Sequence, residues 1–203
     1  MISALTEDCV SGHAPAGITV RKAVMRDIAP LLGLINDYAA EGIMLPRTEF
    51  EISEHIRDFS VALCNGQLIG CGALHFYTPT MGEIRSVAVE KDWKTHGVGR
   101  KLVDFLIAEA EQYSLDAVFA FTYVVDFFRK LGFEPIERGM LPLKAWKDCS
   151  RCKKFQCCDE VAVLRVLRPE RWWEDFAHMG AQPSSSEDEF PFVLLPAVKI
   201  QGS

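Results

Sequence analysis

The chain has 203 residues, of which 49% are hydrophobic and 25% charged, and its net charge is −6. This acidic balance argues against nucleic acid as a partner, and no apolar run reaches the roughly 18 residues that a membrane span needs. We therefore expect neither partner, and one domain of about 150 residues with extensions.

The first strand is predicted at residues 18–23, where apolar and polar residues alternate. Apolar residues then recur at helical spacing after Asp27, and Glu41-Gly42 marks the expected end of that helix. Thr48 and Glu51 have the spacing of a capping box and predict a second helix. Two apolar runs, 59–64 and 67–76, flank Asn65-Gly66, which is a strong hairpin signal.

The second half begins with a predicted strand at 81–89, a polar turn, and a helix from residue 98 with one apolar face. The continuous apolar run 117–122 predicts a strand buried on both faces. A short helix through residues 126–131, closed by Gly132, and two more strands at 133–138 and 160–167 complete the pattern. The fold class is α/β with a mixed sheet, covering residues 18–168.

Both ends of the chain lie outside this predicted domain. Residues 1–17 mix small and acidic residues without a period and predict a flexible tail, with no sign of a signal peptide. Residues 169–203 predict a short helix, an acidic linker at 182–189 and an apolar segment at 190–200. That segment could cover a sheet edge or form the contact of a homodimer.

Seven cysteines are present, and four of them lie between residues 149 and 158. An odd number without a secretion signal does not indicate a disulfide framework and favours a reducing cytoplasm.

The turn between the 81–89 strand and the next helix contains Gly97 and Gly99. Glycines let a backbone approach a ligand closely, and the N–H groups at a helix N-terminus bind anions. The spacing is not that of the dinucleotide fingerprint, because Leu102 stands where a third glycine is required. No Lys-Ser/Thr pair follows the last glycine, which excludes a P-loop.

The stretch Lys94-Thr-His-Gly97-Val-Gly99 resembles the acetyl-CoA pyrophosphate loop of the GNAT acetyltransferases, with Lys94 in place of the usual arginine or glutamine. Residues 127–133, Phe-Phe-Arg-Lys-Leu-Gly-Phe, are similar to another segment of that family. A narrower resemblance, to short-form N-acetylglutamate synthases, is carried by residues 44–47, 70–73, 121–123 and 141–146. It implies a GNAT fold and a cytoplasmic enzyme of arginine biosynthesis that uses acetyl-CoA.

The same resemblance implies which residues bind the cofactor. The strand backbone at Val87, Ala88 and Val89 would hold the pantetheine arm, and Phe128, together with Phe127, would wall the channel. The pyrophosphate would lie on the turn formed by Lys94, His96, Gly97, Val98, Gly99 and Arg100. A helix cap without a ligand is the alternative interpretation.

Glu83 occupies the position of a general base in several family members, although a solvated carboxylate at a strand edge is equally consistent with the sequence. The family's usual tyrosine acid is replaced here, because Phe127 and Phe128 occupy its region. Tyr123 is the nearest substitute, and a packed aromatic is its alternative role.

Arg47 matches a synthase arginine that holds the substrate carboxylate, with a surface arginine as the alternative. Lys144 and Arg151 are candidates for a second cation, as is Lys153, and Cys71 matches a position that offers main-chain groups to the substrate.

The cysteines Cys149, Cys152, Cys157 and Cys158 could complete a structural zinc site, although four residues between the two halves is tight spacing. Packing cysteines or a redox-sensitive loop are the alternatives. His75 and His96 are interpreted as isolated strand and loop residues.

These patterns predict an acetyl-CoA-dependent amino-acid N-acetyltransferase with L-glutamate as acceptor, acting by direct attack of the amine on the thioester. The alternatives are a GNAT enzyme for another small amine or a protein N-terminus, and a non-catalytic acetyl-CoA sensor.

Overall fold

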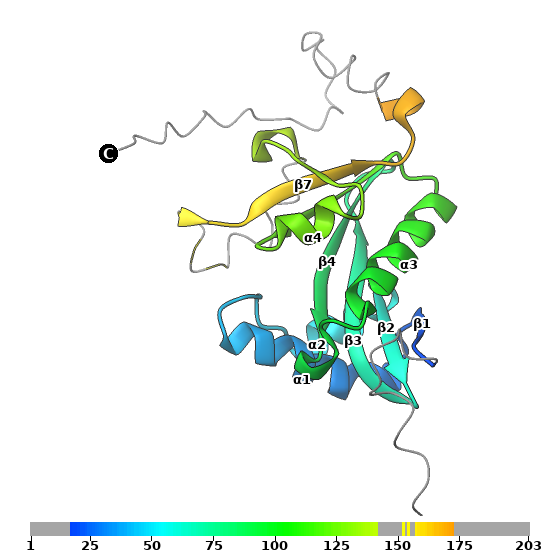
Figure 1. The fold of residues 1–203 in the computed structure, drawn as a ribbon, viewed down its shortest axis with the longest axis vertical. Coiled ribbons are helices and arrows are strands. Elements are labelled where there is room, and N and C mark those ends of the chain that lie inside the picture. Colours follow the sequence, from blue (N-terminus) through cyan, green and yellow to red (C-terminus); the bar gives the residue numbers. More distant parts are fainter. Residues whose placement is uncertain (1–16, 142–151, 153, 155–156, 173–203) are drawn as a thin grey trace, which may run out of the picture.

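A computed structural model describes residues 17–141, 152, 154 and 157–172 of the chain (Figure 1). The described residues form a seven-stranded sheet in the order β1-β2-β3-β4-β5-β7-β6. Only β4 and β5 pair in parallel, and every other neighbouring pair is antiparallel. The strands are β1 (Thr19–Lys22), β2 (Phe59–Cys64), β3 (Gln67–Phe76), β4 (Met81–Val89), β5 (Ala117–Thr122), β6 (Glu134–Pro135) and β7 (Val161–Val166).

Helices cover both faces of this sheet. The α-helices are α1 (Ile28–Ala40), α2 (Glu49–Glu54), α3 (Val98–Gln112) and α4 (Val125–Arg129), and residues 169–172 are also helical. Short 3₁₀ turns lie at Met25–Asp27, Ile56–Asp58, Lys91–Trp93 and Arg138–Met140. The mixed α/β sheet predicted from the sequence is therefore confirmed.

The local sequence signals in the first half of the chain form the structures that they predict. Thr48 Oγ1 accepts from the Glu51 N–H at 3.2 Å, and Glu51 Oε2 accepts from the Thr48 N–H at 2.8 Å, which completes the capping box. Asn65 and Gly66 both have positive φ, as a two-residue hairpin turn between β2 and β3 requires. Gly42, with φ 72°, follows the end of α1.

The prediction of a strand over 133–138 is wrong in its length. Only Glu134 and Pro135 form β6, at the sheet edge beside β7, and the chain then enters the 3₁₀ turn at Arg138–Met140. Proline has no N–H to offer a ladder, so it tolerates this edge position, and the Ile136 N–H after it still donates to the Ala162 carbonyl at 2.9 Å.

The two faces of β3 pack against different helices. Cys71 and Ala73 lie in a cluster with Leu31 and Ile35 of α1, and Leu74 lies in a second cluster with Leu106 of α3. Successive side chains of a strand point to opposite faces, so α1 and α3 cover opposite sides of the sheet. Each fully buried leucine stabilises the fold by about 1.5–3 kcal/mol.

The sheet opens between β4 and β5. Their parallel pairing covers Met81–Glu83 of β4 and Ala117–Phe119 of β5, and both strands continue beyond it. The register between β3 and β4 shifts in the segment that contains Ser86, whose φ is 53°. Such a bulge bends its strand. In Figure 1, β7 crosses the direction of β4, so the two halves of the sheet diverge.

Other sequence-based expectations concern the ends of the chain, the cysteines and membranes. The N-terminal tail and residues 173–203 of the extension lie outside the described residues. Cys64 is disulfide-bonded, whereas Cys71, Cys152, Cys157 and Cys158 are free. Within the described ranges, no helix combines the length and apolarity that crossing a bilayer requires.

Candidate active site

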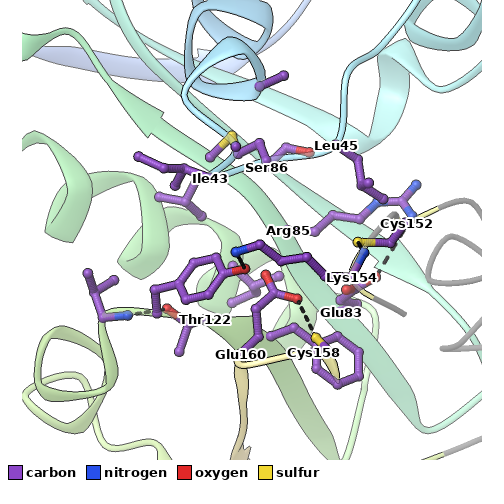
Figure 2. Close-up of a pocket in the computed structure, with 18 of the residues that line it drawn as sticks. Ile43, Leu45, Glu83, Arg85, Ser86, Thr122, Cys152, Lys154, Cys158 and Glu160 are labelled. Atoms are coloured by element: carbon purple, nitrogen blue, oxygen red, sulfur yellow. Dashed lines mark hydrogen bonds and ion pairs between the residues drawn. The ribbon is translucent and has the colours of Figure 1, made fainter. Parts of the chain in front are cut away.

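A cavity of about 670 Å³ lies where β4 and β5 separate (Figure 2). Its walls come from the end of α1 and the loop after it, from β4, from the end of β5, from α4 and from the segment that enters β7. Figure 2 shows Glu83, Arg85, Lys154 and Glu160 gathered around the middle of this space. The volume is within the range of small-molecule sites.

Glu83 ends the β4–β5 ladder and lines the cavity. Its side chain is only 10% exposed, which excludes the interpretation as a fully solvated edge carboxylate. Tyr77 Oη donates to Glu83 Oε2 at 3.0 Å, and Arg85 Nη1 lies 3.8 Å from the same oxygen. A buried carboxylate held in this way beside a cavity can accept a proton from a bound ligand.

Arg47 lies on the loop that follows α1 and lines the same cavity. Asn36 of α1 fixes its backbone, because Asn36 Oδ1 accepts from the Arg47 N–H at 2.9 Å and Asn36 Nδ2 donates to the Arg47 carbonyl at 3.0 Å. The fold therefore brings together the predicted base and the predicted carboxylate-binding arginine.

Tyr123 follows the end of β5 and also lines the cavity. Its hydroxyl accepts from Lys154 Nζ at 3.3 Å. Partial burial raises the pKa of the Tyr123 phenol above its ordinary value, although the Lys154 ammonium acts in the opposite direction. The phenol therefore keeps its proton at neutral pH and is able to donate it.

The glycine turn leads into α3 and meets the cavity through an aromatic side chain. Gly97 is the residue before α3 and has φ 75°, in the left-handed region where glycine is favoured. A Cβ added at Gly99 would lie 3.4 Å from the ring of Phe127 and 3.7 Å from Val89. Phe127 and Phe128 both line the cavity, so this wall joins it to the N-terminus of α3.

The turn has the features of an anion site. The first N–H groups of α3 have no intrahelical acceptor, and nothing lies within 4 Å of a Cβ added at Gly97. The buried Nδ1 of His96 has no hydrogen-bond partner within the described part of the chain. Lys94 is directed to the ring of Tyr38, 5.0 Å away, and Arg100 pairs with Asp104 at 3.5 Å.

The end of β4 lies beside the opening. Val87 lines the cavity, Ala88 is buried, and the Val89 carbonyl accepts from Tyr38 Oη at 2.6 Å. Tyr38 was not anticipated from the sequence. It anchors the strand next to the glycine turn.

Comparison with known proteins shows to which family the chain belongs. Residues 33–133 match the model of the acetyltransferase (GNAT) family. An uncharacterized N-acetyltransferase of Chlorobaculum tepidum is 42% identical over 154 residues, which cover 75% of this chain and 99% of that protein. The chain belongs to the acetyltransferase (GNAT) family. It is thus an N-acetyltransferase, and the predicted GNAT fold is confirmed.

Other relatives, named for a specific acetyltransferase activity, are more distant in sequence. An amino-acid acetyltransferase of Mycobacterium tuberculosis is 36% identical over 121 residues, covering 58% of this chain and 69% of that protein. The structure of Rv2747 from M. tuberculosis in complex with CoA matches with a TM-score of 0.65 at 30% identity, covering 73% of this chain and 99% of that one.

The N-acetylglutamate synthase of Neisseria gonorrhoeae, complexed with coenzyme A and N-acetyl-glutamate, gives a TM-score of 0.69 at 27% identity. The match covers 75% of this chain and 36% of the synthase. This GNAT chain therefore corresponds to about a third of that longer protein.

One of the predicted substrate residues of this acetyltransferase does not line the cavity. Cys71 is buried in the core, outside the cavity lining, and its thiol contacts the Ser86 carbonyl at 3.5 Å. Burial raises the pKa of that thiol to about 12, so it stays protonated. Lys144, Lys153 and Arg151 lie outside the described residues.

Two arginines of the GNAT cavity were missed by sequence reasoning. Arg85 is two residues beyond Glu83 on β4, and alternation along a strand could have indicated that both face the same side. Arg138 lies after β6, donates to the Glu160 carbonyl and to Cys158 Sγ, the latter at 3.2 Å, and stacks over Phe121. No local pattern marks that residue.

The cysteine zinc site is not supported. Cys149 lies outside the described residues, and no group of three or more close metal-ligating side chains in the described ranges includes Cys152, Cys157 or Cys158. Cys158 Sγ accepts from Arg138 and lies 3.7 Å from Glu160 Oε2, to which it donates. Burial raises the pKa of the Glu160 carboxyl.

His75 is a strand residue, as predicted, but it is not isolated. His75 on β3 lies with His55 and Asp58, and their ligand atoms are within 4.8 Å of one another. His96 does remain a residue of the glycine turn.

Proposed function

We propose that this acetyltransferase transfers the acetyl group of acetyl-CoA to the α-amino group of an amino acid, with L-glutamate as the acceptor. The observation that carries this proposal is that Glu83 and Arg47 line one cavity at the opening of the sheet. The catalytic domain would comprise residues 18–168, acting in the cytoplasm in arginine biosynthesis. The names of two relatives, the amino-acid acetyltransferase of M. tuberculosis and the N-acetylglutamate synthase of N. gonorrhoeae, support the acceptor class.

Acetyl-CoA would enter the opening between β4 and β5. Its pyrophosphate would meet the N–H groups from Gly97 to Arg100, where the helix dipole favours an anion. Its pantetheine arm would follow the backbone of Val87 to Val89 and pass the ring of Phe127. The thioester would then lie in the cavity beside Glu83 and Tyr123.

The acceptor amine must lose a proton before it attacks the thioester. We assign this step to Glu83, which lines the cavity and is held in place by Tyr77 and Arg85. The amine nitrogen forms a bond to the carbonyl carbon, and the C–S bond then breaks. Tyr123 supplies the proton that the departing thiolate takes up, which its raised pKa allows.

The cavity would recognise an amino-acid acceptor by its carboxylates. Arg47 presents a guanidinium, which grips a carboxylate through two parallel hydrogen bonds. Arg85 is suited to the second carboxylate of glutamate, because its side chain is 12% exposed and lines the same cavity. Lys144 and Arg151 stay predictions for this role.

The test is product identification by mass spectrometry with acetyl-CoA and each of the common amino acids, in wild type and two arginine variants. Arg47→Ala should raise KM for glutamate about 10-fold to 100-fold, as expected for loss of a charge-assisted contact worth roughly 1.5–3 kcal/mol. KM for acetyl-CoA should not change. Arg26→Ala, at an exposed position before α1, is the matched control.

Two results would reject the proposal. One is the absence of N-acetylglutamate while another amine or a peptide N-terminus is acetylated. The other is a glutamate KM in Arg47→Ala equal to that of the control.

A further inference from the structure

We propose that His55, Asp58 and His75 form a binding site for a divalent transition-metal ion of the zinc and cobalt class. The three residues do not line the acetyl-transfer cavity. They lie on the face of the sheet that carries α1 and α2, because His75 continues the alternation of Cys71 and Ala73 along β3.

The donor atoms lie close enough together to converge on one ion once the hydrogen bond between His75 and Asp58 opens. Asp58 Oδ2 lies 2.6 Å from His75 Nδ1 and 3.6 Å from His55 Nδ1, and all three ligand atoms fall within 4.8 Å. A tetrahedral zinc ion bound at about 2.0–2.1 Å would separate its nitrogen and oxygen ligands by about 3.3 Å. The observed spacing brackets that value, so small side-chain rotations suffice.

The backbone holds two of these ligands together. The Asp58 N–H donates to the His55 carbonyl at 2.9 Å, at the 3₁₀ turn formed by Ile56–Asp58. Side chains three residues apart are eclipsed in such a turn, which brings His55 over Asp58. The Asp58 carbonyl also accepts from Lys22 Nζ at 3.2 Å, which ties the turn to β1.

The third ligand is positioned by packing. The ring of His75 meets the ring of His55 edge-on at 5.5 Å between centroids, and it meets Tyr77 in the same manner at 5.0 Å. Ligands whose orientation is fixed before the metal arrives lose less conformational freedom on binding.

The donor set indicates the class of ion. Two imidazoles and one carboxylate suit zinc, cobalt or nickel, whereas magnesium and calcium prefer oxygen ligands alone. The side chains of His55, His75 and Asp58 are 37%, 24% and 24% exposed, so an ion and a coordinated water can reach the site.

The same carboxylate couples this site to the cavity. Asp58 Oδ2 lies 3.9 Å from Arg85 Nη2, and Arg85 Nη1 lies 3.8 Å from Glu83 Oε2. A cation on Asp58 repels the guanidinium and moves it toward Glu83. Metal binding should therefore slow acetyl transfer, a consequence that rests on the proposed role of Glu83.

Binding is tested by titrating Co²⁺ into the full-length protein and following its ligand-field absorption and the heat of binding. Wild type should bind one equivalent without the absorption of a cobalt–thiolate bond, and Zn²⁺ should displace the cobalt. His55→Gln and His75→Gln should each weaken cobalt binding about 10-fold or more. Loss of a residue that only hydrogen-bonds to a metal ligand already lowers metal affinity about 10-fold to 100-fold, so loss of the ligand itself should lower it at least as much. Asp104→Asn, an exposed carboxylate on α3, is the control and should bind like wild type.

The site is refuted if wild type binds no cobalt, if the absorption is that of a thiolate complex, or if both histidine variants bind as wild type does. His55 is the more exposed histidine, so His55→Gln decides the matter should His75→Gln fail to fold. The coupling has its own readout, the rate of product formation with Zn²⁺ measured by mass spectrometry. Inhibition of wild type that is absent in His55→Gln supports it, and equal rates with and without Zn²⁺ overturn it.

Discussion

The side-chain amide of Asn36 binds both backbone polar groups of Arg47, at 2.9 Å to the N–H and at 3.0 Å to the carbonyl. A residue inside α1 thus fixes the loop position from which the arginine reaches the cavity. This arrangement ties the Arg47 end of the cavity to helix α1, although Arg47 itself lies on a loop.

Asn36→Ala should therefore loosen the loop without removing the guanidinium. We expect KM for the acceptor amino acid to rise about 3-fold to 10-fold, in line with net hydrogen-bond contributions near 1 kcal/mol, with KM for acetyl-CoA unchanged. Steady-state kinetics with each substrate varied in turn measures this. Gln112→Ala, at the exposed end of α3, is the control, because it also removes a side-chain amide. An effect of the same size in this control would contradict the role of Asn36 in positioning Arg47.

Glu83→Gln keeps the shape of the side chain and removes its basicity. The rate of acetyl transfer should fall about 10²-fold to 10⁴-fold, which is the usual contribution of a general base. Calorimetric affinity for acetyl-CoA should stay as in wild type. The exposed Glu111→Gln is the control, and a Glu83→Gln enzyme as active as this control would exclude Glu83 as the base.

Gly99→Val tests the packing that connects the glycine turn to the cavity. A Cβ at this position would already lie 3.4 Å from the Phe127 ring, so the two additional methyl groups must displace that ring or the turn. Affinity for CoA should drop about 10-fold or more, as expected for an overpacking cost of roughly 1–3 kcal/mol. Gly33→Val in α1 has open space around the added side chain and should leave CoA binding unchanged.

The phenol of Tyr123 is predicted to set the alkaline limit of activity. Its pKa is raised mainly by burial, so the protonated form should persist and the rate should fall only above about pH 10, the ordinary pKa of tyrosine. Lys154 favours the phenolate, and hence Lys154→Met should move this limb to higher pH. A limb that stays in place in Tyr123→Phe would show that another group titrates.

The sequence predicted correctly those elements that depend only on residues adjacent along the chain. The capping box at Thr48, the hairpin at Asn65-Gly66 and the glycine turn at Gly97 depend on the conformational preferences of a few adjacent residues. The strand predicted over 133–138 depended on its partner β7, and its ladder ends before the chain enters the 3₁₀ turn at Arg138–Met140.

The features of the candidate site likewise fall into those that the sequence indicated and those that needed the structure. A distinctive local motif indicated the cofactor loop. The resemblance placed the candidates for a second cation in the C-terminal region, whereas the structure shows Arg85, two residues from Glu83 along β4, in the cavity lining. The choice between a solvated and a buried Glu83 also needed the structure, since burial depends on what packs over the strand.

By itself, the sequence determined the fold class, the glycine turn before α3 and the chemical types that the site contains. Only the tertiary structure decided which of them meet. The short β4–β5 ladder opens the cavity that Arg47 and Glu83 both line, and the β3–β4 register and the turn at Ile56–Asp58 set Asp58 beside both His75 and Arg85. These meetings depend on strand register and on packing between distant segments, which no local pattern of residues encodes.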